Sequence, residues 1–213
     1  MKFSVLTLFP ESVSCYFASS MLARAQDAGL INIELINPRD YSLDKHKCVD
    51  DAPYGGGPGM VMMVQPLVSA WENVTANSTA SRTKAIIFSP SGEKLTNEMA
   101  REWATEFDHL VLIAGRYEGV DARVREIINA TEISIGDYVL TGGEVPAMAL
   151  VDVVSRQIKG VLGNQDSLEE ERAASHKVYT RPETYTHKGE DFSVPEILLK
   201  GHHKMIEEWR KDN

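Results

Sequence analysis

The chain has 213 residues, of which 43% are hydrophobic, and it carries a net charge of -9. This length suits one sizeable α/β domain with room for a small second one, and the apolar content excludes wholesale disorder. A net negative chain also lacks the general basic surface that indiscriminate nucleic-acid binding requires, although a local basic patch is compatible with the total.

Cysteine content and hydropathy bear on the compartment. Cys15 and Cys48 are the two cysteines, and without a C-x-x-C motif they form neither a disulfide framework nor a zinc set. We therefore expect a reducing compartment and a cytoplasmic location. The apolar run at residues 3–9 stops at Pro10 without a small-residue cleavage site, which indicates a strand and not a signal peptide. No stretch approaches the ~20 apolar residues of a membrane span.

The first 36 residues alternate between strand and helix patterns. Residues 2–9 read as a strand that Pro10 closes, and residues 31–36 read as the next. Between them we expect one helix, capped by Ser12 and ended by Gly29. Its apolar stripe comprises Val13, Phe17, Met21 and Ala25. The strand-helix-strand order favours parallel pairing through a right-handed crossover.

Residues 38–60 form a long stretch without hydrophobic periodicity. Four glycines end it, but no Gly-Lys-Ser/Thr follows and Met60 stands where G-x-G-x-x-G needs glycine, so a phosphate loop is excluded. Loops this long inside a domain are usually functional or disordered. Two interpretations stay open: a flexible surface loop, or a mobile lid. The lid's polar contacts to a substrate would be Asp50, Asp51 and Tyr54.

Three apolar strands are each followed by a glycine-containing loop. Residues 85–88 precede Ser89-Pro90-Ser91-Gly92, and residues 110–114 precede Gly115-Arg116-Tyr117-Glu118-Gly119. A third strand ends at Ile135, before a loop with Gly142 and Gly143 and a helix with Pro146 in its first turn. Each loop alone could be an ordinary strand-to-helix turn. Together they favour one ligand pocket at the carboxyl ends of a parallel sheet.

Further helices are predicted over residues 66–74, after the capping residues Thr96 and Asp121, and over residues 146–158. Arg156 falls near the end of the last helix, where a cation suits the helix dipole. After residue 163 the sequence becomes largely polar. We therefore divide the chain into a first domain at 1–163, a linker at 164–178 and a small C-terminal domain at 179–213, with a final helix from about His202 to Arg210. His202 and His203 lack a third ligand at useful spacing, and no metal site is expected.

These motifs, in this order, resemble the bacterial tRNA (guanine-N1)-methyltransferases, which belong to the SPOUT class of methyltransferases. The resemblance covers nearly the whole chain. It is carried by Phe9-Pro10-Glu11, Pro38-Arg39-Asp40, Val49-Asp50-Asp51, residues 53–60, Ser89-Pro90-x-Gly92, residues 115–123, residues 134–147 and Tyr179-Thr180-Arg181-Pro182.

The resemblance implies a deep trefoil knot within an α/β fold, with a small helical C-terminal domain that binds tRNA. It also implies a homodimer with each active site at the subunit interface, and methylation of N1 of the guanosine at tRNA position 37. The knot loops would hold S-adenosylmethionine in a bent form. The residues implied in that role are Ser89, Pro90, Gly92, Gly115, Tyr117, Gly119, Ile135, Gly136, Asp137, Tyr138, Val139, Leu140, Gly142, Gly143 and Pro146.

Two residues follow from the resemblance as catalytic. Guanine N1 must lose a proton, and charge then develops toward O6. Arg156 aligns with the family's cation, and Glu171 with its base, which is usually an aspartate; Glu170 and Glu169 are the neighbours to consider. Tyr179 and Arg181 join the substrate contacts. The chemistry is compatible with Mg²⁺, on which the sequence itself carries no signal.

Three other functions compete with this reading. A SPOUT-type methyltransferase for a different RNA would share the donor motifs, and a non-catalytic RNA-binding relative would keep the knot without turnover. A dinucleotide-dependent dehydrogenase is disfavoured because G-x-G-x-x-G is missing. Residues 164–213 carry 8 Lys and Arg against 11 Asp and Glu, so they offer no obvious electrostatic grip on RNA.

Overall fold

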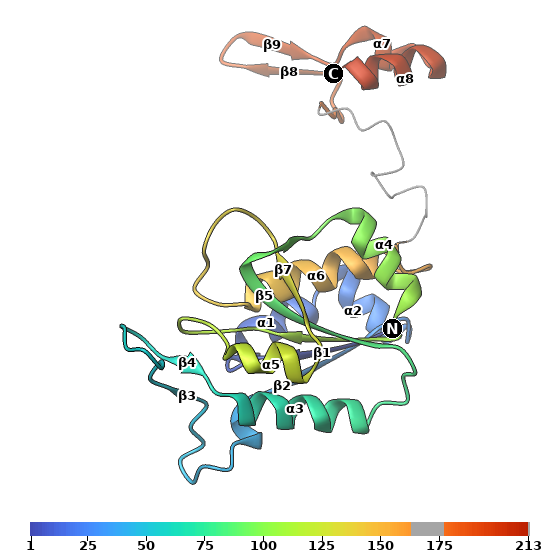
Figure 1. Cartoon of the computed structure of the whole chain (residues 1–213). Coiled ribbons are helices and arrows are strands. Elements are labelled where there is room, and N and C mark those ends of the chain that lie inside the picture. The colour runs from blue at the N-terminus through green and yellow to red at the C-terminus, as the bar shows by residue number, and fades with distance from the viewer. Residues whose placement is uncertain (163–176, 213) are drawn as a thin grey trace. The chain divides into compact units, whose positions relative to one another are not determined.

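A computed structural model describes residues 1–162 and 177–212. The chain divides into two compact units, Met1–Gly163 and Asn164–Asn213, and each is described by itself (Figure 1). Across the described residues, no helix has the length and apolar character needed to cross a membrane.

The first unit is an α/β domain built on five parallel strands in the order β2-β1-β6-β5-β7. Its sheet strands are β1 Lys2–Leu6, β2 Asn32–Ile36, β5 Thr83–Lys94, β6 His109–Ile113 and β7 Thr131–Ser134. Its helices are α1 Pro10–Phe17, α2 Ser20–Asp27, α3 Val64–Ala76, α4 Asn97–Glu106, α5 Ala122–Ile127 and α6 Glu144–Gln157.

Helices cover both faces of the sheet, as the alternation of strand side chains requires (Figure 1). Leu110 and Leu112 of β6 pack into a core with α1, α2, α4 and α6. Val111 and Ile113, pointing the other way, pack into a second core with α3 and α5. The predicted parallel sheet with helices on both faces is therefore confirmed.

The central strands end together at one edge of the sheet. Leu6 of β1 lies opposite Ile113 of β6, and Ile87 of β5 lies opposite the same residue. Because the strands are parallel, the segments that follow β1, β5 and β6 all leave from this carboxyl edge, where ligand sites of open α/β sheets lie.

The predicted first helix is two helices. Its start is Pro10 with Phe9 as the N-cap residue, so the prediction of a Ser12 cap was wrong. Ser20 has a left-handed φ of 51°, which interrupts the helix between α1 and α2. The break shifts the buried stripe, so that Leu22 is buried while Met21 is only partly buried.

Two stretches predicted to be loops carry more regular structure. Strand β5 continues through Ser89-Pro90 to Lys94, with a register shift between Phe88 and Glu93. Within residues 38–62, a 3-10 helix (η1, Pro38–Tyr41) precedes a short antiparallel pair, β3 Asp50–Asp51 and β4 Val61–Met62. The four glycines of this stretch all have left-handed φ, which explains why glycine occupies these positions.

The second unit is a mixture of hairpin and helix. Strands β8 Thr184–His187 and β9 Glu190–Ser193 pair antiparallel, followed by α7 Glu196–Leu199 and α8 His203–Asp212. The small C-terminal domain that we expected to be helical therefore also contains an antiparallel hairpin. Lys188 and Gly189 both adopt left-handed φ, the requirement of a tight two-residue hairpin turn.

Candidate functional site

A cavity of about 210 Å³ opens at the carboxyl ends of β5, β6 and β7. Three segments form its walls: the turn in β5 at Phe88-Ser89-Pro90, the loop after β6, and the loop between β7 and α6. The lining residues are Phe88, Ser89, Pro90, Gly115, Arg116, Tyr117, Glu118, Gly119, Val120, Ile133, Ser134, Ile135, Gly136, Tyr138, Val139, Leu140, Thr141, Gly142, Gly143 and Pro146.

Glycine is required where the second and third walls meet. The Gly143 amide donates to the Gly115 carbonyl at 2.8 Å. A Cβ atom at Gly143 would lie 2.6 Å from Ala114 Cα, a distance that real Cβ contacts do not reach. The two main chains can therefore lie this close only because residue 143 has no side chain.

The cavity mouth carries exposed apolar and aromatic side chains. Tyr117, Tyr138 and Leu140 are partly exposed, and Val139 is 81% exposed. Tyr138 donates from its hydroxyl to the Ile135 carbonyl at 3.1 Å, which fixes the ring within its own loop. Tyr117 has a left-handed φ of 60°, a strained value for a residue with a side chain, and such strain is concentrated at functional sites.

The segment predicted as a surface loop or lid is hydrogen-bonded to the cavity wall. The Glu118 amide donates to the Met60 carbonyl and the Met62 amide to the Gly119 carbonyl, both at 2.9 Å. A parallel bridge joins Met62 to Val120. Burial raises the pKa of Tyr117, and the nearby Asp50 carboxylate raises it further because it disfavours the phenolate. The segment therefore shares one wall with the cavity.

Most residues that the resemblance implied for S-adenosylmethionine lie around this one cavity, and two do not. Gly92 is not among the lining residues; a Cβ there would meet the Ile133 amide nitrogen at 2.6 Å, so glycine lets β5 lie close to β7 at this position. Asp137 is also outside the lining, and its carboxylate pairs with Lys94 Nζ at 2.6 Å on the surface.

The implied catalytic and substrate residues are spread over the chain. Arg156 lies in the last turn of α6, partly buried, with its Nε buried and lacking a hydrogen-bond partner within the described residues. Glu171 lies outside the described residues. Asp50 begins β3 and is partly buried, whereas Asp51 and Tyr54 are exposed.

Tyr179 and Arg181 belong to the second unit. The Tyr179 ring lies 6.2 Å from that of Trp209, between centroids, and both Tyr179 and Arg181 are exposed. Tyr185 and Phe192 face each other across the β8–β9 hairpin and are also exposed, so the unit presents several aromatic side chains to solvent.

Sequence reasoning missed seven lining residues: Phe88, Arg116, Glu118, Val120, Ile133, Ser134 and Thr141. Arg116 is the most informative of them. Its Nε lies 2.9 Å from Glu144 Oε2, too poorly aligned for a hydrogen bond and therefore an ion pair. The signal was available, because Arg116 stands inside the same Gly-x-x-x-Gly loop as Gly115 and Gly119.

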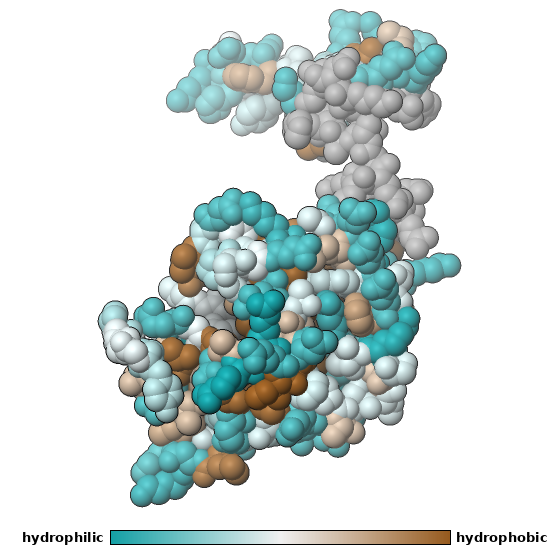
Figure 2. All heavy atoms as spheres, viewed as in Figure 1, coloured by the Kyte–Doolittle hydropathy of each residue, from teal (hydrophilic) through white to brown (hydrophobic). Residues whose placement is uncertain are grey.

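No cluster of three or more histidine, cysteine, aspartate or glutamate side chains within residues 1–162 and 177–212 is arranged to hold a metal ion. The face of the first unit seen in Figure 2 is mixed, with apolar patches among hydrophilic and intermediate residues.

The fold and cavity define an α/β protein with a glycine-lined cavity at the carboxyl edge of its parallel sheet, where ligand sites of open α/β sheets lie. Comparison with known proteins specifies its family. The family model described as tRNA (guanine-1)-methyltransferase TrmD matches residues 1–213. The chain therefore belongs to the tRNA (guanine-1)-methyltransferase family.

Individual relatives agree with this assignment. A tRNA (guanine-N(1)-)-methyltransferase of Ruminiclostridium cellulolyticum is 49% identical over 99% of this chain and 89% of the relative. Proteins of the same name from Desulforamulus reducens and Thermomicrobium roseum are 47% and 50% identical, again over 99% of this chain, and over 83% and 78% of their own lengths.

Proposed function

We propose that this chain transfers the methyl group of S-adenosylmethionine to N1 of the guanosine at position 37 of tRNA. The observation that carries the proposal is a cavity formed by three segments at the strand ends, two of them lined by glycine, in a chain that matches a tRNA (guanine-1)-methyltransferase family over its whole length. The donor class follows from the family's methyl-transfer chemistry, and the cavity supplies a place for it.

The residues around the cavity fit an adenosine-containing donor. Glycines at positions 115, 136, 142 and 143 bring the main chain close enough for backbone groups to hydrogen-bond a purine. Tyr117, Tyr138 and Leu140 add apolar surface that a flat ring system can cover. When bound, the donor supplies an already activated sulfonium methyl group, so no nucleophilic side chain is needed.

The chain's own task is to make guanine N1 nucleophilic. N1 carries a proton that a base must remove, and negative charge then develops on O6. The Nε of Arg156, buried and without a hydrogen-bond partner among the described residues, is a donor suited to such an oxygen. We assign proton removal to Glu171, with Glu170 and Glu169 as its nearest alternatives. Running the methyl-transfer assay with and without Mg²⁺ tests whether the metal assists the reaction.

A homodimer with shared active sites explains where Arg156 lies. Pro146, in the first turn of α6, lines the cavity, and Arg156 follows ten residues later. At a helical rise of 1.5 Å per residue the two positions are about 15 Å apart. We infer that Arg156 serves the cavity of a second subunit, and that the exposed Val139 and Tyr138 at the mouth are covered by that subunit.

We also propose the trefoil knot. Strand β7 is separated from β6 by β5, yet the chain leaving β7 reaches Gly115 at the end of β6 through Gly143. It then enters α6, which packs against α4 and α1. The segment therefore crosses over the end of β5, as a knotted passage would require. Asp50, Asp51 and Tyr54, with Tyr179 and Arg181, are the proposed tRNA contacts.

The test is methyl transfer to transcribed tRNAs that differ only in having guanosine or another base at position 37, followed by mapping of the methylated atom. We expect product only with guanosine, at N1. Methylation elsewhere, or of another RNA, would favour a related methyltransferase. Donor binding by calorimetry without turnover on any tRNA would favour the non-catalytic relative.

A second experiment assigns the catalytic roles. Arg156→Ala should lower single-turnover methyl transfer roughly 100-fold or more with donor affinity unchanged, because it removes a charge-stabilising donor. Lys159→Ala, which removes an exposed cation three residues later and just past the end of α6, is the matched control. Glu171→Gln should lower the rate similarly, compared with Glu170→Gln and Glu169→Gln. If the rate falls in Glu170→Gln or Glu169→Gln and not in Glu171→Gln, the base is the residue whose substitution lowers the rate.

Light scattering tests the dimer independently. An active monomer would contradict the proposed sharing of active sites. Mixing Arg156→Ala chains with Glu171→Gln chains sharpens the result further, since the activity recovered in mixed dimers depends on whether the two residues serve the same site.

A further inference from the structure

We propose that the Arg116–Glu144 ion pair is a latch that sets the shape of the donor cavity, with Arg116 as a positioning residue for donor binding. This inference rests on the proposed function, because it concerns how the same cavity holds the donor. Its starting point is that Arg116 joins segments that are distant along the chain.

Glu144 provides the fixed end of the latch. It is the first residue of α6 and its side chain is only 6% exposed. A buried carboxylate is tolerated only when it is well compensated. Thr7, fully buried at the end of β1, donates its hydroxyl to Glu144 Oε1 at 2.8 Å, and the helix N-terminus adds favourable dipole charge. Arg116 supplies the balancing cation at Oε2.

Arg116 is the other end of the latch, and its guanidinium contacts three groups at once. Beside the ion pair, Nη1 donates to the Thr141 carbonyl at 3.3 Å. The face of the guanidinium lies 4.6 Å from the centroid of the Phe9 ring. A lysine would keep the charge but not the planar fork that serves a carboxylate and a carbonyl together.

The consequence for the cavity comes through Thr141 and Gly142. Thr141 lies inside the lining run that extends from Ile133 to Gly143 without Asp137, so its carbonyl anchors that wall. Gly142 lies against the ion pair: a Cβ there would be 2.6 Å from Arg116 Cδ. Removing the fork frees this wall where it meets α6, and the cavity loses its preformed shape.

The experiment compares Arg116→Lys with Arg123→Lys. Arg116 lies in the loop after β6, and Arg123 lies in the first turn of α5. Arg123 is exposed, pairs with Asp121 at 2.7 Å and is outside the cavity lining. Donor affinity is measured by calorimetry with S-adenosylmethionine, at a temperature where circular dichroism shows every variant folded. We expect Arg116→Lys to weaken donor binding at least fivefold, the low end of typical coupling between sites, and Arg123→Lys to leave it within twofold.

A purely stabilising role is separated by kinetics. If the latch positions the donor, Arg116→Lys raises the KM for the donor while kcat at saturating donor stays near the wild-type value. Glu144→Gln, which keeps the side-chain shape, should act in the same direction. The double variant should fall short of the sum of the two single effects, since both break one interaction.

The outcomes are distinguishable. If the wild-type chain binds donor and Arg116→Lys matches Arg123→Lys in affinity and KM, the latch is overturned while the proposed function stands. If the wild-type chain binds no S-adenosylmethionine, the proposed function fails and the latch with it. Should Arg116→Lys not fold, Glu144→Gln gives the same comparison of donor affinity against Glu132→Gln, whose partly buried carboxylate pairs with Arg125 outside the cavity lining.

Discussion

The two ends of the central sheet both carry a hollow, and they are built from different materials. At the carboxyl end, glycine loops bring main chain around a cavity of about 210 Å³. At the amino end, a hollow of about 460 Å³ is lined by Met1, Lys2, Asn32, Asp108 and residues 77–81, among others. The larger hollow, at the amino end, lacks walls made of glycine loops. Volume alone therefore does not identify the ligand site.

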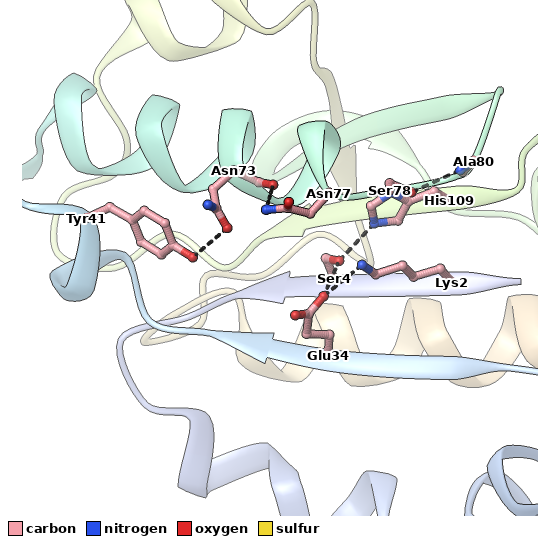
Figure 3. A network of polar contacts seen from close by, with 9 residues as sticks. All are labelled: Lys2, Ser4, Glu34, Tyr41, Asn73, Asn77, Ser78, Ala80 and His109. Atoms are coloured by element: carbon pink, nitrogen blue, oxygen red, sulfur yellow. Dashed lines mark hydrogen bonds and ion pairs between the residues drawn. The ribbon is translucent and has the colours of Figure 1, made fainter.

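Several polar groups at the amino end are paired with one another, although the buried Nδ1 of His109 has no hydrogen-bond partner among the described residues. Lys2 Nζ lies 2.9 Å from Glu34 Oε2, and the Ser4 hydroxyl lies 2.8 Å from His109 Nε2 (Figure 3). Arg82 pairs with Asp108 at 2.7 Å. Groups that satisfy each other stabilise the fold but offer little to a ligand. At the carboxyl end, by contrast, glycine leaves the main chain accessible, which is what a binding site requires.

The largest effect that tests this contrast between the two ends of the sheet is expected from adding a methyl group at Gly143. We expect Gly143→Ala to weaken S-adenosylmethionine binding by 100-fold or more, because the new Cβ would lie 2.6 Å from Ala114 Cα and backbone cannot yield easily. Gly115→Ala, also in the cavity lining, is the graded comparison: its Cβ would meet a Val120 methyl at 3.1 Å, which a side chain can accommodate, so we expect a smaller loss. Equal calorimetric affinities for both variants would contradict the close-approach argument.

At the amino end we predict an effect on stability alone. His109 is fully buried, and desolvation, with a smaller effect of the nearby Lys2, lowers its pKa to about 4, although Glu34 opposes the shift. The unfolded histidine titrates near 6.5, so the unfolded chain takes up a proton first as pH falls. Stability is therefore fully present above pH 6.5 and is lost as pH falls toward 4, by about 2 kcal/mol between pH 7.5 and 5.

His109→Gln should remove this slope, because glutamine does not titrate, while costing stability at pH 7.5. Chemical denaturation at each pH measures it, with His46→Gln in an exposed turn as control. Arg82 holds the pKa of Asp108 at about 2, so that carboxylate contributes its own pH dependence only below about pH 4. An unchanged slope in His109→Gln would show that another group titrates.

The smallest expected effect concerns Asp137, at the carboxyl end but outside the cavity lining. Its side chain is 79% exposed and its pairing with Lys94 is a surface ion pair. Asp137→Asn should leave donor affinity within twofold and change Tm by roughly 2 °C at most. A tenfold loss of affinity would show that the Asp137 carboxylate itself contacts the donor, and that residues 135–140 do not act through backbone alone.

Local sequence determined much of this protein. The apolar residues of β6 and the glycine loops after three strands were enough to predict a parallel sheet with a pocket at its carboxyl edge. These features depend on neighbours along the chain, through side-chain alternation and backbone freedom. The β8–β9 hairpin was missed despite a local signal, since Lys188-Gly189 between alternating threonine, tyrosine and phenylalanine positions suits a two-residue turn.

Other features were decided by tertiary structure. Ser20 interrupts the first helix although the apolar stripe runs through it, and after the break Leu22 is buried while Met21 packs against the core only partly buried. Arg116 meets Glu144 across 28 residues, Thr7 meets the same carboxylate across 137, and Ser4 meets His109 across 105. No period or motif encodes such pairs. They exist because the sheet brings the ends of β1 and β6 together and returns the chain after β7 to the same edge, where a buried carboxylate must find its donors.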